Sequence, residues 1–274
     1  MSGSSVTAPK LCNCRKCIFF ASYYPSKGIV DDSLSGGGQM ASVDVLTPPA
    51  PARSFKFSRV MAWLRCLFLA CCLLAQPFLS ASTLPSEQTV ARYGPKAQRL
   101  FHQWQSLLQS LANHPDAEAL KNINVFFNRR IQYAENESVW NQADYWATPL
   151  ETFGKGAGDC KSFVINKYVS FRLLGIAPQK LRLVYVKAQI GGGASHITQA
   201  HMVLAYYPTP TSEPLILDNL IDSIEPASRR PDLIPVFSFN MENIVVGGKT
   251  SNEVDRLGRW KQLLTKLKAE GFEF

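Results

Sequence analysis

Apolar side chains recur at helical spacing in three segments beyond residue 83. The first two are 86–112 and 116–132, and each has one apolar face that we expect to pack inside the protein. The third begins after Asp159, a residue type that often caps helix N-termini. Its apolar positions follow at i, i+4, i+7 and i+10, at Val164, Tyr168, Phe171 and Leu174. Gly175 predicts the end of this helix.

Beyond residue 180 the apolar period changes to the alternation that is typical of strands. The expected elements are four strands and a closing helix, over 181–188, 200–207, 214–218, 236–239 and 252–268. Because helices come first and an antiparallel meander follows, the pattern predicts one α+β domain over 83–274.

An apolar run of a different kind lies upstream of these elements. Basic residues between Arg53 and Arg59 precede it, and small residues around Ala81 follow it, which is the order of a secretory signal. Arg65 interrupts the run, and the stretch 66–75 is too short to span a bilayer of about 30 Å. We therefore expect 53–82 to be a signal peptide cleaved near Ala81. The alternatives are a retained anchor or a lipoprotein signal.

Residues 1–52 precede the expected signal and are rich in glycine, serine and proline. We expect a disordered extension, or translation that begins downstream at Met40 or Met61. Three cysteines between positions 12 and 17 have no fourth ligand pattern, so a metal site is not expected there.

Most of the net positive charge of the chain lies in residues 1–82, upstream of the expected domain. The whole sequence carries 29 basic and 21 acidic residues, a net charge of +8, and 46% of it is hydrophobic. Residues 1–82 hold eight of the basic and three of the acidic residues, which leaves 21 and 18, a net +3, for 83–274. The composition supports a packed core, and no nucleic-acid-binding surface is predicted on the folded domain.

Cys160 is the one cysteine of seven that the exported domain would keep, so it cannot form an internal disulfide. It lies in the first turn of the helix predicted after Asp159. The partial positive charge and the free backbone N–H groups at a helix N-terminus favour a thiolate, and the same groups can stabilise an oxyanion.

His201 and Asp218 are the candidate partners of this thiol. If a four-residue loop over 208–211 joins their strands, paired residue numbers sum to 419, which places the two residues opposite each other on one face. The carboxylate would then orient the imidazole, as the third member of a triad does. A shift of one residue would separate them. His196 is a rival base that we expect in an exposed loop. An inert thiol with a core histidine and a turn carboxylate is the structural alternative.

Six short motifs follow one another along the chain. They are Trp146–Glu151, Gly158–Lys161, Ala200–Tyr207, Leu217–Leu220, Pro226–Ala227 and Pro235–Asn240. Together they resemble the LapG-type bacterial transglutaminase-like cysteine proteinases over most of 85–270. The resemblance implies a papain/transglutaminase-like α+β fold, with the nucleophile at a helix N-terminus packed on an antiparallel sheet.

The resemblance also implies the roles of individual residues and a biological setting. It makes Cys160 the nucleophile, His201 the base and Asp218 the orienting carboxylate. It implies a periplasmic protease that cleaves the N-terminal region of a large surface adhesin between small residues, typically two alanines, and so controls release from biofilm. It further implies sequestration by an inner-membrane cyclic-di-GMP receptor.

Calcium dependence is a further implication of the resemblance, with acidic residues beside the nucleophile as ligands. Asp159 fits that pattern and is the candidate calcium ligand. The residue after the cysteine is often acidic in the family, but here it is Lys161. A lysine cannot ligate a hard cation and would repel it, so calcium would depend on other oxygens.

Three functions are compatible with these residues. The first, which we expect, is a thiol endopeptidase. The second is an acyl transferase or cross-linker with the same triad, in which an amine instead of water attacks the thioester. The third is a non-catalytic binding module that has kept the fold.

Overall fold

The computed structural model describes residues 82–191, 195–251 and 257–274. The predictions made for 1–52, and for 53–82 apart from Ser82, therefore concern segments outside the described residues. Among the described helices, none is both long enough and apolar enough to cross a membrane.

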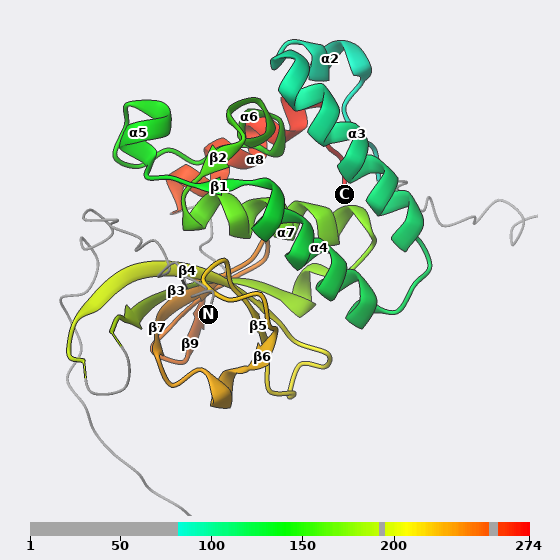
Figure 1. Cartoon of the computed structure of the whole chain (residues 1–274). Coiled ribbons are helices and arrows are strands. Elements are labelled where there is room, and N and C mark those ends of the chain that lie inside the picture. The colour runs from blue at the N-terminus through cyan, green and yellow to red at the C-terminus, as the bar shows by residue number, and fades with distance from the viewer. Residues whose placement is uncertain (1–81, 192–194, 252–256) are drawn as a thin grey trace, which may run out of the picture. The chain divides into compact units, whose positions relative to one another are not determined.

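Helices form one layer of the described body (Figure 1). They are α2 (Glu87–Ala91), α3 (Gly94–Leu111), α4 (Asp116–Arg130), α5 (Asn136–Trp140), α6 (Pro149–Lys155), α7 (Cys160–Leu173) and α8 (Gly258–Glu270). The predicted helix over 86–112 is thus two helices. Gly94 has a positive φ of 87° and Pro95 follows it, so the chain turns there and starts a new helix with proline in its first turn.

An antiparallel sheet forms the other layer, in the order β6-β5-β4-β3-β7-β8-β9. Its strands are β3 (Leu181–Gln189), β4 (Thr198–Tyr206), β5 (Leu215–Leu217), β6 (Glu225–Pro226), β7 (Leu233–Phe239), β8 (Ile244–Val246) and β9 (Lys249–Ser251). Short 3-10 turns, η1 (Pro178–Lys180) and η2 (Ala227–Arg229), precede β3 and follow β6. The expected α+β fold is confirmed.

The predicted meander holds only for β3, β4, β5 and β6, which pair in sequence. The fourth predicted strand, 236–239, lies in β7, which pairs with the opposite edge of β3. The proline in the two-residue β6 explains this change of direction, because it lacks the N–H that a further ladder would need. A separate parallel pair, β1 (Gln132–Tyr133) and β2 (Ala157–Gly158), leads the chain into α7.

The predicted register between β4 and β5 is wrong by two. Leu204 pairs with Leu217, so paired numbers sum to 421 and not 419. The cause is the position of the connection, which runs from 207 to 214 and has its midpoint one residue later than the expected loop over 208–211. Because side chains alternate with a period of two, this shift preserves which face each residue occupies. His201 and Asp218 therefore stay on the same side.

Helix α7 lies between the other helices and the sheet, in contact with α4 and α6 on one side and with β3 and β4 on the other (Figure 1). Every residue from Cys160 to Phe171 is buried, which is the behaviour of a central helix rather than of an amphipathic surface helix. The start of α7 is consequently held by packing on all sides. This packing fixes the position of the Cys160 thiol.

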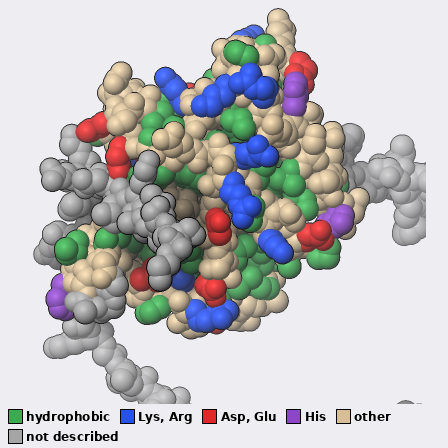
Figure 2. Space-filling view, in the orientation of Figure 1, with side chains coloured by type: hydrophobic (Ala, Val, Ile, Leu, Met, Phe, Trp, Pro, Cys, Tyr) green, Lys and Arg blue, Asp and Glu red, His purple; other side chains and the backbone are tan. Residues whose placement is uncertain are grey.

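Charged side chains of both signs are interspersed over the face shown in Figure 2. This matches the nearly balanced charge of 83–274. The absence of a nucleic-acid partner stays a prediction.

Candidate active site

Cys160 is the first residue of α7 and its side chain is buried, with 2% of its surface exposed. Asp159 caps the helix, because its Oδ1 accepts a hydrogen bond from the backbone N–H of Ser162 at 3.1 Å. Gly158 is required by close approach: a Cβ there would lie 2.5 Å from that of Ser162. The Gly-Asp-Cys order therefore has a local structural basis. It brings the chain tightly into the helix with the thiol at its N-terminus.

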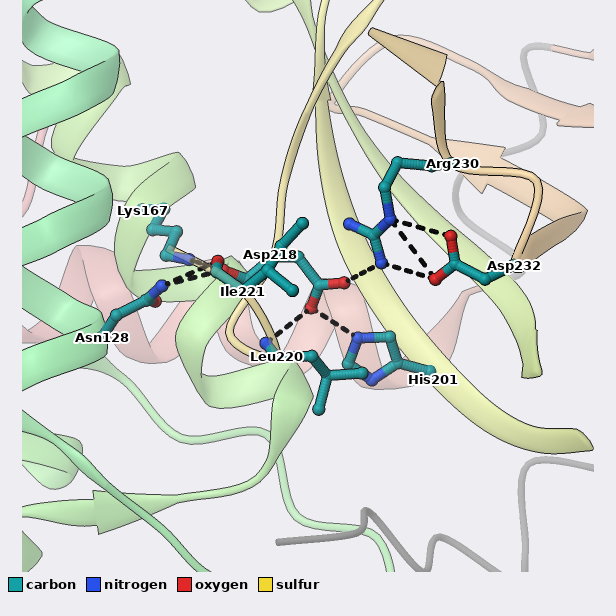
Figure 3. A network of polar contacts seen from close by, with 8 residues as sticks. All are labelled: Asn128, Lys167, His201, Asp218, Leu220, Ile221, Arg230 and Asp232. Carbon is teal, nitrogen blue, oxygen red and sulfur yellow. Dashed lines mark hydrogen bonds and ion pairs between the residues drawn. The ribbon is translucent and has the colours of Figure 1, made fainter. Parts of the chain in front are cut away.

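His201 lies on β4 and Asp218 directly follows β5. Nε2 of the imidazole and Oδ1 of the carboxylate are 2.7 Å apart, and both side chains are fully buried (Figure 3). The predicted contact is therefore present, although Asp218 lies just beyond the last residue pair of the two strands.

The second ring nitrogen of His201, Nδ1, is buried without an oxygen or nitrogen partner in the described residues. The Cys160 side chain lies close enough to this ring to help raise the pKa of His201. The structure thus brings together the three predicted residues from the start of α7, from β4 and from the end of β5. His196 is exposed, as expected.

The protonation of the pair follows from its surroundings. Burial alone would lower the pKa of His201, but the hydrogen bond and charge of Asp218, with further contributions from Cys160, raise it to about 10. Burial alone would raise the pKa of Asp218, but His201 and Arg230 hold it well below its usual range. The pair is therefore an imidazolium and a carboxylate at neutral pH.

Arg230 is a site residue that the sequence analysis missed. Its guanidinium donates from Nη2 to Oδ2 of Asp218 at 2.8 Å, and from Nε and Nη2 to the carboxylate of Asp232 at 3.0 and 2.8 Å (Figure 3). Asp218 Oδ1 also accepts from the backbone N–H of Leu220 at 3.1 Å. A fully buried carboxylate needs a cation or N–H donors as partners. Burial of Asp218 is therefore the one feature that could have suggested an arginine beside it.

The backbone carbonyl of Asp218 is held from the helical layer. Lys167 Nζ in α7 donates to it at 3.1 Å and Asn128 Nδ2 in α4 at 2.9 Å (Figure 3). Burial lowers the pKa of Lys167 to about 7, although the charges of Asp218 and Asp222 oppose that effect. The Lys167 contact fixes the Asp218 backbone to the helix that carries Cys160, and the Asn128 contact fixes it to α4.

Asp159 and Lys161 form a buried ion pair beside the nucleophile, and each side chain is 1% exposed. Lys161 also lies 3.7 Å from Oδ1 of Asp144. The acidic group that the sequence analysis offered as a calcium ligand is thus bound by an ammonium of the same chain. Among the described residues, no group of three or more His, Cys, Asp or Glu side chains could hold a metal ion. The donor set does not fit calcium.

Comparison with known proteins agrees with this geometry. The family model for bacterial transglutaminase-like cysteine proteinases (BTLCP) matches residues 102–231. The solved structure of Legionella pneumophila LapG is 35% identical, with a TM-score of 0.58, over 68% of this chain and 99% of that one. The chain belongs to this proteinase family. The matched region includes Cys160, His201, Asp218 and Arg230.

Two further structures of the same relative are similar to this family member. EGTA-treated L. pneumophila LapG is 34% identical, with a TM-score of 0.58, over 68% of this chain and 100% of that one. The calcium-bound form is 36% identical, with a TM-score of 0.57, over 66% and 96%. A comparison with curated proteins gives no significant match. Family membership and the sheet-and-helix architecture together confirm the papain/transglutaminase-like fold.

Proposed function

We propose that the protein is a cysteine endopeptidase in which Cys160 is the nucleophile, His201 the general acid and base, and Asp218 the group that orients the imidazole. The observation that carries this proposal is the buried 2.7 Å contact between His201 and Asp218 on a ring that also interacts with the Cys160 thiol. A nucleophile, a base and an orienting group in contact are the arrangement that covalent catalysis requires.

The proposed reaction begins with attack of the Cys160 sulfur on the scissile carbonyl carbon. The oxyanion that forms is stabilised by backbone N–H groups in the first turn of α7. The His201 imidazolium gives its proton to the departing amine, which leaves a thioester on Cys160. The neutral imidazole then takes a proton from water, and the hydroxide releases the acid product and the thiolate.

The proposed setting is the periplasm, after export directed by residues 53–82. The proposed substrate is the N-terminal region of a large surface adhesin, cut between small residues, so that cleavage releases cells from biofilm. The proposed regulator is an inner-membrane cyclic-di-GMP receptor that sequesters the enzyme. Support for these three points comes from the ordered motifs and from membership of the proteinase family.

The test is incubation of the purified protein with a candidate adhesin from the same cell, followed by mass spectrometry of the products. Hydrolysis gives two fragments whose masses sum to that of the substrate plus water, whereas acyl transfer to an amine gives a heavier species. Cys160→Ala is expected to abolish the cut while circular dichroism stays unchanged. Full cleavage by the alanine variant would overturn the proposal, and binding without turnover would favour a non-catalytic module.

A further inference from the structure

The first turn of α7 contains a positive charge directly beside the nucleophile, whereas L. pneumophila LapG has been solved in calcium-bound and EGTA-treated forms. Lys161 follows the nucleophile directly, and its ammonium pairs with Oδ2 of Asp159 with both side chains 1% exposed. The other oxygen of Asp159, Oδ1, accepts from the backbone N–H and the hydroxyl of Ser162 at 3.1 and 3.2 Å. Both carboxylate oxygens are therefore engaged by the helix that they cap.

Asp144 is the second acidic group beside this ammonium, and it is also occupied. Its Oδ1 accepts from the indole Nε1 of Trp146 at 3.1 Å and lies 3.7 Å from Lys161 Nζ. Its Oδ2 lies 3.5 Å from Nε of Arg259 in α8. Two cations of this chain thus neutralise the two carboxylates near the start of α7.

A calcium ion has no room in this arrangement on chemical grounds. Calcium takes six to eight oxygen ligands at about 2.3–2.6 Å, several of them carboxylates. An ion on Asp159 would have to replace the ammonium of Lys161, whose side chain is 1% exposed. L. pneumophila LapG, in contrast, has been solved in a calcium-bound form.

We infer that Lys161 is a built-in cation that replaces calcium in this protein. Its ammonium balances the buried charge of Asp159, bridges toward Asp144 and keeps the helix start in place, so the fold around Cys160 forms without a metal. This inference concerns the ion pair and does not require that Cys160 cleave peptides. It predicts that calcium and EGTA leave the protein unchanged.

The decisive variant is Lys161→Glu, which puts a third carboxylate beside Asp159 and Asp144. Like charges then repel in the absence of a cation, and the same three groups become oxygen ligands for one. We expect Tm of the variant to fall in EGTA and to rise by roughly 5 °C when calcium is added. Lys121→Glu is the matched control, because Lys121 is exposed on α4 and its variant has the same change in charge. Its Tm should not respond to calcium.

The wild-type protein supplies the second readout, which stands even if Lys161→Glu fails to fold. Isothermal titration with calcium chloride should show no saturable binding, and Tm should be equal in calcium, magnesium and EGTA. Stoichiometric calcium binding, or a calcium-dependent rise in Tm of the wild type, would overturn the inference. Loss of peptide cleavage in every condition would count against the proposed protease and leave the ion-pair result intact.

Discussion

Two buried aspartates belong to the structure around Cys160, and they differ in the partner that each one has. Asp218 is paired with the imidazole of His201, and Asp159 with the ammonium of Lys161. Both carboxylates are almost fully buried, at 0% and 1% exposure, so each needs a cation to remain charged. Burial accounts for the pairing in both places.

The nature of the partner separates the two sites. An imidazole can accept and return a proton during a reaction, so the Asp218 site can take part in one. The ammonium of Lys161 acts as a fixed charge at a helix start. Asp218 has a second cation, Arg230, at 2.8 Å, so its carboxylate remains partnered when the imidazole gives up its proton. The Asp218 site suits the proton transfer that we propose, and the Asp159 site stabilises the start of α7.

The largest expected effect comes from Asp218→Asn, which removes the charge that orients and stabilises the imidazolium. We expect kcat/KM for peptide cleavage to fall by roughly 10³-fold, mainly in kcat. Asp222→Asn is the control, because Asp222 lies in the following loop with its side chain 58% exposed. Its activity should stay within about twofold of wild type. Comparable rates of peptide cleavage for the Asp218 variant and the wild type would contradict a catalytic role of Asp218, and the two aspartates would then not differ in function.

Arg230→Met should have the next largest effect, because it leaves the buried Asp218 with one cation fewer. We expect a loss of about 3 kcal/mol in the free energy of unfolding. Arg230 helps to hold the pKa of Asp218 low, so without it the carboxylate protonates at higher pH and activity is lost earlier on the acid side.

Arg230→Lys keeps a positive charge, so it should restore part of the activity that Arg230→Met loses at acid pH. If the role of Arg230 were purely structural, its substitution would change stability without changing the pH at which activity is lost. Chemical denaturation and pH–rate profiles on the same preparations separate the two results.

The smallest expected effect is on alkaline stability. Because the folded-state pKa of His201 is raised from 6.5 to about 10, its stabilisation is fully present below pH 6.5 and is lost as pH rises toward 10. We expect about 2 kcal/mol of this loss between pH 6.5 and pH 9 in urea unfolding. His201→Gln should flatten that slope. An equal slope in both proteins would show that His201 is not charged in the fold.

The sequence predicts those parts of the site that depend on local signals. The Gly-Asp-Cys turn and the apolar spacing after it indicate the start of α7, and alternation indicates the strands that carry His201 and precede Asp218. The register was wrong by two because no sequence pattern fixes the midpoint of the 207–214 connection. His201 and Asp218 still meet, because a shift of two residues leaves each side chain on the same face of the sheet.

The hydrogen-bond network around Asp218 cannot be predicted from such local signals. Arg230, Lys167 and Asn128 come from three separate segments and meet at Asp218 only in the folded chain. None of them lies in a recognisable motif, and burial of Lys167 on a central helix contradicts its usual surface location. The break at Gly94 was missed because apolar spacing continues through it. Roles of these residues in catalysis stay predictions.

The most direct test of the central claim is the rate at which iodoacetamide labels Cys160 in the native protein at pH 6, followed by peptide mass spectrometry. A thiolate held by the His201 imidazolium predicts labelling at least about tenfold faster than that of a free cysteine thiol at the same pH, with that advantage lost in His201→Ala. Labelling that requires denaturant, or a rate that His201→Ala leaves unchanged, would contradict the account.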